Sequence, residues 1–215
     1  MLLQRVSESG QRDLQIRWRY FSLAQVNSKE EGWTLWGAAE TDPAAKGRLA
    51  FGAAEAARRQ GRFEVLHAAL LEARHLHRSD LDDAEVIERL AGEAALDMNR
   101  FRRDMADPTI LDTLAADHQA AVSELGVFGT PTFNLPDRGL AYVRVRPAPE
   151  GTAALELFDQ LVRIVAEEPY LIELKRPRRP PILNSADANS SDGLVLPPRR
   201  GNAVHLSDLE RGPKA

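Results

Sequence analysis

The most suggestive group of residues for chemistry is Gly129-Thr130-Pro131, which opens a short stretch of predicted strand. Proline lacks a ladder N–H and belongs at a strand start or an edge, and a glycine two residues earlier lets the backbone turn sharply. A cis X-Pro bond costs only about 0.5–1 kcal/mol. A cis bond would turn the Thr130 backbone outward, where its N–H and C=O could pair with an extended peptide or a thiol substrate. An ordinary trans-proline turn fits the same spacing, so spacing alone leaves both interpretations open.

The other residue types that could carry out chemistry point to no catalytic group. The sequence contains no cysteine, which excludes disulfides, thiolate metal sites and a cysteine nucleophile within these 215 residues. The spacings of His67, His75 and His77 do not match a compact ligand set such as HExxH. His118 lies on the apolar side of a predicted helix, which favours a hydrogen-bonded core histidine. We therefore expect no metal site, no catalytic residue and no cofactor.

Several aromatic residues could form either core or pocket. Trp18 and Tyr20 alternate with arginines, which is more typical of core or cross-strand packing. Trp33 and Trp36 stand three residues apart and could line one wall of a cleft beside a helical region. Glycine-rich phosphate loops of the GxGxxG or Walker type are absent, which argues against a nucleotide cofactor bound in the usual ways.

Hydrophobic periodicity predicts the elements that must position these residues. Alternation over residues 14–23 predicts a strand with one buried face, and residues 1–6 would end a helix. Residues 48–126 read almost entirely as helix, with Asp107-Pro108 as a strong helix start. Two short strands at 132–135 and 140–145 and an amphipathic helix over about 152–167 follow.

This order predicts an α/β fold with an all-helical insertion at about residues 48–126. We expect residues 1–174 to form the folded domain and the Pro- and Arg-rich residues 175–215 to be a largely disordered tail. The formal net charge of -4 gives no reason to expect nucleic-acid binding. No run of about 18 apolar residues and no signal peptide is present, so we expect no membrane association and a cytoplasmic location.

Several separated motifs together resemble a known family. GVFGTPTF (126–133), WRYFSLAQVN (18–27), AFGAAEAARRQG (50–61) and the closing PYLIELKRP (169–177) resemble cytoplasmic DsbA-like proteins of the FrnE type. The resemblance implies a thioredoxin-like fold with a helical insertion and an oxidoreductase activity of the thiol–disulfide exchange class. It also implies that Gly129, Thr130 and Pro131 form the substrate-facing cis-proline loop, with a peptide or low-molecular-weight thiol as substrate.

The sequence departs from that family where the reactive residue would lie. In the family a cysteine pair, or its replacement, sits at the N-terminal end of the first helix, just after the first strand. If residues 14–23 are the second strand, that segment would precede Met1, and we expect an N-terminally truncated fold whose true start lies upstream. We therefore expect this chain to be inactive in dithiol exchange.

Two other functions remain open on the sequence alone. The chain could be a non-catalytic module in which the loop and the helical insertion bind a peptide or partner. It could instead be a glutathione-type isomerase or transferase, in which the cis-proline loop would hold the thiol cofactor. The sequence does not define the oligomeric state.

Overall fold

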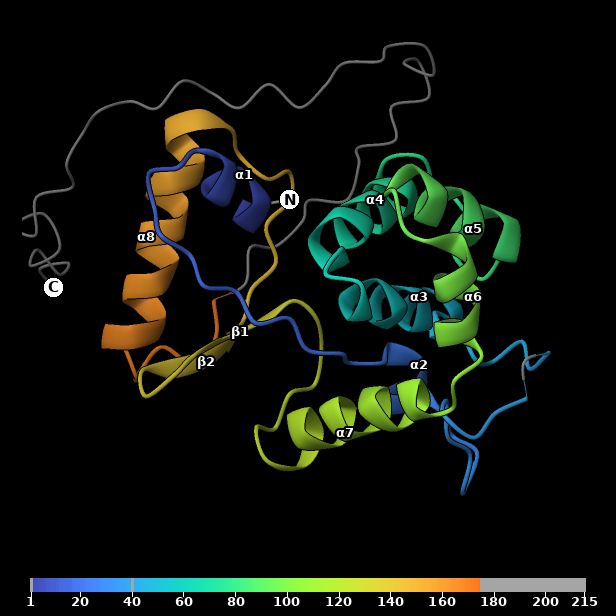
Figure 1. The fold of residues 1–215 in the computed structure, drawn as a ribbon. Coiled ribbons are helices and arrows are strands. Elements are labelled where there is room, and N and C mark those ends of the chain that lie inside the picture. The colour runs from blue at the N-terminus through green and yellow to red at the C-terminus, as the bar shows by residue number, and fades with distance from the viewer. Residues whose placement is uncertain (1, 40, 175–215) are drawn as a thin grey trace, which may run out of the picture. The chain divides into compact units, whose positions relative to one another are not determined.

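The computed structural model describes residues 2–39 and 41–174, and this part of the chain is mostly helical with a two-stranded sheet (Figure 1). Residues up to Ile172 form one compact unit, and of the second unit only Glu173 and Leu174 are described. The tail predicted over residues 175–215 lies outside the described residues. The elements are α1 (Leu2–Glu8), α2 (Leu23–Asn27), α3 (Arg48–Arg59), α4 (Phe63–His75), α5 (Ala84–Glu93), α6 (Met98–Met105), α7 (Thr109–Ser123), β1 (Thr132–Leu135), β2 (Gly139–Tyr142) and α8 (Gly151–Glu167). The mixed α/β class is confirmed at this level.

Helix α3 is the centre of the helical region and contacts α4, α5, α6 and α7. Its buried positions are almost all glycine or alanine, over Gly52–Ala57 with Glu55 as the exception. Such small side chains let neighbouring helices approach closely, so that the larger side chains of those helices fill the core. The largest fully buried side chains among them are Leu66, Ile87, Phe101 and Leu114.

Aspartates set the starts of three helices in this region. The side chains of Asp83 and Asp97 accept hydrogen bonds from backbone N–H groups in the first turns of α5 and α6. Asp107 accepts from the Thr109 N–H at 2.9 Å, with Pro108 between them. These bonds satisfy N–H groups that a helix leaves unpaired at its start. The helix predicted to start at Asp107-Pro108 is present and begins one residue later, at Thr109, with Pro108 as its N-cap.

The strand predicted over residues 14–23 is absent from the described structure. Burial does alternate from Leu14 to Tyr20, so the predicted buried face exists. No described strand lies beside it to form a ladder, and a strand needs such a partner to satisfy its backbone. Side chains of α7 take that role instead. Asp117 accepts from the Tyr20 N–H and His118 from the Ser22 N–H, both at 3.2 Å.

The hairpin β1–β2 is antiparallel, with Thr132 opposite Tyr142 and Leu135 opposite Gly139. The first predicted strand is confirmed, and the second begins and ends earlier than predicted. Gly139 has φ +146°, and a Cβ there would lie 2.6 Å from the Val165 carbonyl oxygen of α8. Glycine is therefore needed for the hairpin to approach α8 this closely. On α8, Ala154 and Leu155 pack against Leu2 and Val6 of α1.

Two phenylalanines provide a test of where the core lies. Phe101 is 2% exposed in the helical core, whereas Phe128 is 69% exposed. Phe101→Ala should lower the free energy of unfolding by about 3 kcal/mol, because it removes apolar contacts and leaves a cavity. Phe128→Ala should lower it by less than about 1 kcal/mol. Chemical denaturation of both variants checks this, and equal losses would contradict the position of the core.

Candidate functional site

The loop from α7 into β1 carries the residues singled out from the sequence. Helix α7 ends at Ser123, and the chain turns at Gly126, whose φ is +65°. The Val127 N–H then donates to the Ala121 carbonyl at 2.9 Å, which closes the helix end. The Thr130–Pro131 peptide bond is cis. The Pro131 carbonyl accepts from the Val143 N–H at 3.0 Å, so the hairpin pairing begins at the proline.

The loop leaves one residue with an unpaired backbone. The Thr132 hydroxyl donates to the Gly129 carbonyl at 2.7 Å and so fixes the turn. Thr130 is exposed, and neither its N–H nor its C=O forms a hydrogen bond within residues 2–39 and 41–174. These two groups are a donor and an acceptor on one residue, which is the pattern that an extended backbone pairs with.

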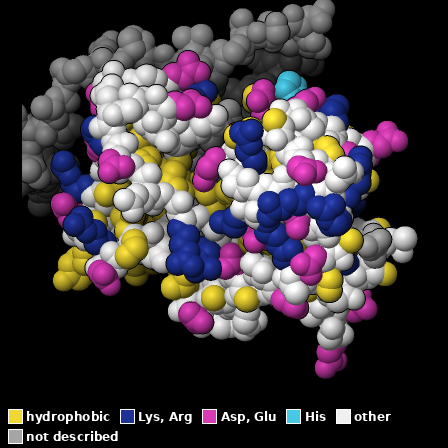
Figure 2. All heavy atoms as spheres, in the orientation of Figure 1, with side chains coloured by type: hydrophobic (Ala, Val, Ile, Leu, Met, Phe, Trp, Pro, Cys, Tyr) yellow, Lys and Arg dark blue, Asp and Glu magenta, His cyan; other side chains and the backbone are white. Residues whose placement is uncertain are grey.

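An aromatic surface borders the loop. Gly129 is buried against Tyr142, because a Cβ on Gly129 would lie 3.3 Å from the Tyr142 Cε2. The Tyr142 ring also contacts Phe128, with ring centroids 5.3 Å apart. Figure 2 shows hydrophobic side chains exposed over α7 and the hairpin, where Val122, Leu125, Phe128, Leu140 and Tyr142 are all more than a third exposed. The unpaired Thr130 backbone therefore stands beside an apolar surface.

Sequence reasoning missed Tyr142 and Phe128 as neighbours of the loop. Tyr142 reaches Gly129 only because the hairpin register places it opposite Thr132. The alternation at residues 140–145 indicated a strand, but not which residue of it would face the loop. Phe128 lies within the stretch GVFGTPTF, and its exposed, apolar character was the available signal.

A buried charged cluster ties residues 14–22 to α3. The Tyr20 hydroxyl and the Arg58 Nε each donate to the Glu55 Oε2 at 2.9 Å. The Arg58 guanidinium also lies 4.0 Å from the centre of the Phe63 ring. Glu55 is only 7% exposed, and a carboxylate buried to this degree must be paired. Burial is the main cause that raises the pKa of Tyr20, so its hydroxyl remains a donor to Glu55. This cluster is structural.

The structure separates Trp33 from Trp36. Trp36 lines a pocket of about 660 Å³, whereas the Trp33 indole N–H lies outside that pocket and donates to Asp42 at 2.8 Å. His118 is buried and lines the same pocket. Among the residues that the structure describes, no three His, Asp or Glu side chains gather as a metal site would require.

The fold and the loop define a mixed α/β protein with a helical region between its N-terminal segment and a closing hairpin and helix. The model of the Rv2466c-like family, described as the mycothiol-dependent nitroreductase Rv2466c, matches residues 4–176. The chain belongs to this family, which is one of mycothiol-dependent oxidoreductases. It is also 29% identical to the uncharacterized protein Rv2286c of Mycobacterium tuberculosis over 182 residues, which cover 80% of this chain and 73% of that protein.

The family match corrects the FrnE-type assignment, which was wrong. The motifs behind that assignment are an alanine-rich helix, a Thr-Pro loop and a closing segment. Such residues reflect helix packing and backbone geometry. These features of the fold do not identify the thiol that a family uses. No described helix is long and apolar enough to span a membrane.

His67 provides a pH test of the contact between residues 14–22 and the helical region. Its ring lies between Trp18 and Phe63, with centroids 4.5 and 5.1 Å away. Burial, reinforced by the positive charge of Arg58, lowers the pKa of His67 to about 4. The unfolded chain binds this proton near pH 6.5. The folded protein should therefore lose stability as the pH falls from about 6.5 towards 4.

Denaturant unfolding at pH 7 and pH 4.5 measures this loss. His67→Phe keeps a ring between Trp18 and Phe63 and removes the titrating group, so the variant should lose less stability over the same interval. NMR titration of the His67 ring should place its midpoint well below 6.5. A normal midpoint, or equal losses in the two proteins, would show that His67 is not buried between these rings.

Proposed function

We propose that this chain serves a thiol-dependent redox reaction and that the loop Gly129–Pro131 binds the thiol or disulfide partner. The observation that carries the proposal is the unpaired backbone of Thr130 on an exposed loop beside Tyr142 and Phe128. Membership of a family of mycothiol-dependent oxidoreductases supports it and favours a low-molecular-weight thiol as the partner.

The proposed fold is thioredoxin-like over residues 1–174, with the helical region inserted at about 48–126. Three features support it: the loop enters the hairpin at a proline, the hairpin packs on the closing helix α8, and the helices α3–α7 stand between residues 14–22 and that loop. In this arrangement the chain brings a helix end, a turn and a strand start together at the proposed binding loop.

The chain supplies binding and not the reactive sulfur. Thiol–disulfide exchange proceeds by attack of a thiolate on a disulfide sulfur. These 215 residues contain no cysteine, so the attacking thiolate and the disulfide must both come from outside them. In the proposed complex the Thr130 N–H donates to a carbonyl of the bound thiol and the Thr130 C=O accepts from an N–H of it. Tyr142 and Phe128 then shield the neighbouring part of the ligand from water.

A peptide disulfide could use the same two backbone groups. An extended peptide pairs its main chain with an unpaired N–H and C=O and places its side chains on flanking apolar surface. The exposed Leu125, Phe128 and Leu140 offer such a surface. We rank this partner second because the family is named for a low-molecular-weight thiol.

Backbone recognition at Thr130 can be tested with two substitutions at one position. Thr130→Pro removes the N–H, whereas Thr130→Ala keeps it and removes a side chain that makes no hydrogen bond to a described residue. Thr130→Pro should weaken binding of oxidised mycothiol about fivefold, the value of one net hydrogen bond of ~1 kcal/mol. Thr130→Ala should bind as the wild type does.

Calorimetric titration with oxidised mycothiol measures both affinities, and a short peptide disulfide serves as the second ligand. Tighter binding of the peptide disulfide than of oxidised mycothiol would favour a peptide as the partner of the loop. An absence of binding by the wild-type chain, or equal affinity in all three proteins, would show that the loop does not bind thiols through its backbone.

The lack of a sulfur nucleophile has its own consequence. The purified chain should not reduce insulin above the rate of a control without protein, because no thiolate is present to attack the insulin disulfides. Turbidity of precipitating insulin chains measures this, with thioredoxin and dithiothreitol as the positive control. Reduction by this chain would refute the requirement for an external thiol.

A further inference from the structure

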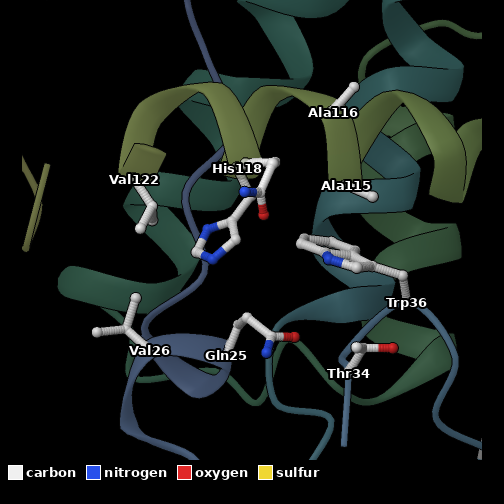
Figure 3. Close-up of a pocket in the computed structure, with 9 residues that line it drawn as sticks. Gln25, Val26, Thr34, Trp36, Ala115, Ala116, His118 and Val122 are labelled. Atoms are coloured by element: carbon white, nitrogen blue, oxygen red, sulfur yellow. The ribbon is translucent and has the colours of Figure 1, made fainter. Parts of the chain in front are cut away.

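The pocket that contains His118 lies between α2, the residues around Trp36, and α7 (Figure 3). Its volume of about 660 Å³ is within the range of small-molecule sites in proteins. We propose that this pocket binds an uncharged aromatic molecule whose carbonyl oxygen accepts a hydrogen bond from the His118 Nε2–H. The inference goes beyond the proposed function, because it concerns a different ligand and does not depend on the Thr130 loop.

His118 is a buried polar group with one nitrogen left for a ligand. The side chain projects from α7 towards Gln25 and Val26 and is only 6% exposed. Its Nδ1 accepts the hydrogen bond from the Ser22 N–H, so in the neutral ring the proton is on Nε2. Burial lowers the pKa of His118, which favours this neutral form. Nε2 forms no hydrogen bond to a described residue and is not among the buried atoms that lack a partner, so this donor is open to the pocket and its solvent.

Three of the other polar side chains that line the pocket form hydrogen bonds with neighbouring residues. Gln25 accepts from the Leu35 N–H at 2.7 Å and donates to the Trp33 carbonyl at 3.3 Å. The Thr34 hydroxyl oxygen accepts from the Gly37 N–H at 3.0 Å. Gln119 donates to the hydroxyl of Ser123 along α7. Among the described lining residues, the His118 Nε2–H and the indole N–H of Trp36 are ring donors without a hydrogen-bond partner, and of the two the His118 donor belongs to the more buried ring.

The walls select an apolar and uncharged ligand. No Asp, Glu, Lys or Arg lines the pocket, so its walls offer no ion pair to a charged ligand. The Trp36 ring supplies an aromatic wall, with its centroid 5.8 Å from that of His118. Val26 and Val122 are both exposed and line the pocket, so the apolar lining continues to the solvent. An aromatic body with a carbonyl acceptor matches the apolar walls and the His118 donor.

A matched pair of ligands tests the hydrogen bond. 1-Indanone has a planar aromatic body and a ketone, whereas indane has the same ring system without the oxygen. Titration of the full ¹⁵N-labelled chain, followed by NMR, should show 1-indanone shifting the indole resonance of Trp36 and amides of α7. Indane should bind at the same place with roughly two- to tenfold lower affinity, which is the range of one net hydrogen bond.

Three variants separate the pocket from the donor. His118→Asn places an oxygen near the position of Nδ1, which keeps an acceptor for the Ser22 N–H and removes the Nε2 donor. It should bind the ketone and the hydrocarbon equally. Ala115→Leu fills the pocket and should abolish binding of both ligands. Thr113→Leu is the control, since Thr113 is exposed on the same helix and does not line the pocket.

Each result either supports or overturns the assignment. Loss of the preference for the ketone in His118→Asn supports it. If His118→Asn does not fold, loss of binding of both ligands in Ala115→Leu supports it. Equal affinities of the wild type for both ligands, unchanged binding in Ala115→Leu, or shifts confined to residues outside the pocket would overturn it. Failure of oxidised mycothiol to bind at Thr130 leaves these outcomes unaffected, so the two proposals can fail separately.

Discussion

Helix α7 holds residues 14–22 in place through two neighbouring side chains, and this contact determines much of the remaining structure. Asp117 and His118 accept the backbone N–H groups of Tyr20 and Ser22, which have no strand to pair with. Two neighbouring side chains, each accepting one bond, can replace a ladder partner. The same helix ends at Ser123 and leads into the Thr130 loop. The position of α7 therefore fixes the N-terminal segment, the pocket at His118 and the start of the loop.

The second requirement is that α7 itself be held firmly, and α3 provides this. The small residues of α3 allow α7 to pack against it along with α4, α5 and α6. Glu55, the one charged residue on that buried face, is stabilised by Tyr20 and Arg58. Residues 14–22 are thus joined to the helical region twice, once through the backbone to α7 and once through Tyr20 to α3. The polar contacts on both sides of this segment lie in or beside the core, where an unpaired polar group is costly and hydrogen-bond geometry is tightly constrained.

Local sequence signals predicted the hairpin and the helices from α3 onwards, but not the short helix α2. Asp107-Pro108 predicted α7, the enrichment in alanine predicted α3, and the Thr-Pro pair predicted the start of β1. Residues 14–20 show the limit of this approach. Their alternating burial follows from the sequence, but a strand also requires a partner, which no local pattern contains. Tyr142 illustrates the same limit at the loop, because its contact with Gly129 depends on hairpin register. The family assignment required comparison, since packing motifs do not encode the identity of the thiol.

The two proposed ligands meet the chain through different chemistry, and both depend on α7. At Thr130 the recognition groups belong to the backbone, so any residue other than proline leaves the donor and acceptor in place. At His118 recognition depends on one side-chain nitrogen whose proton is positioned because Ser22 occupies the other nitrogen. Val122 lines the pocket one helical turn after His118, and α7 ends one residue later. A displacement of the last turn of α7 would change the pocket wall and the path into the loop together.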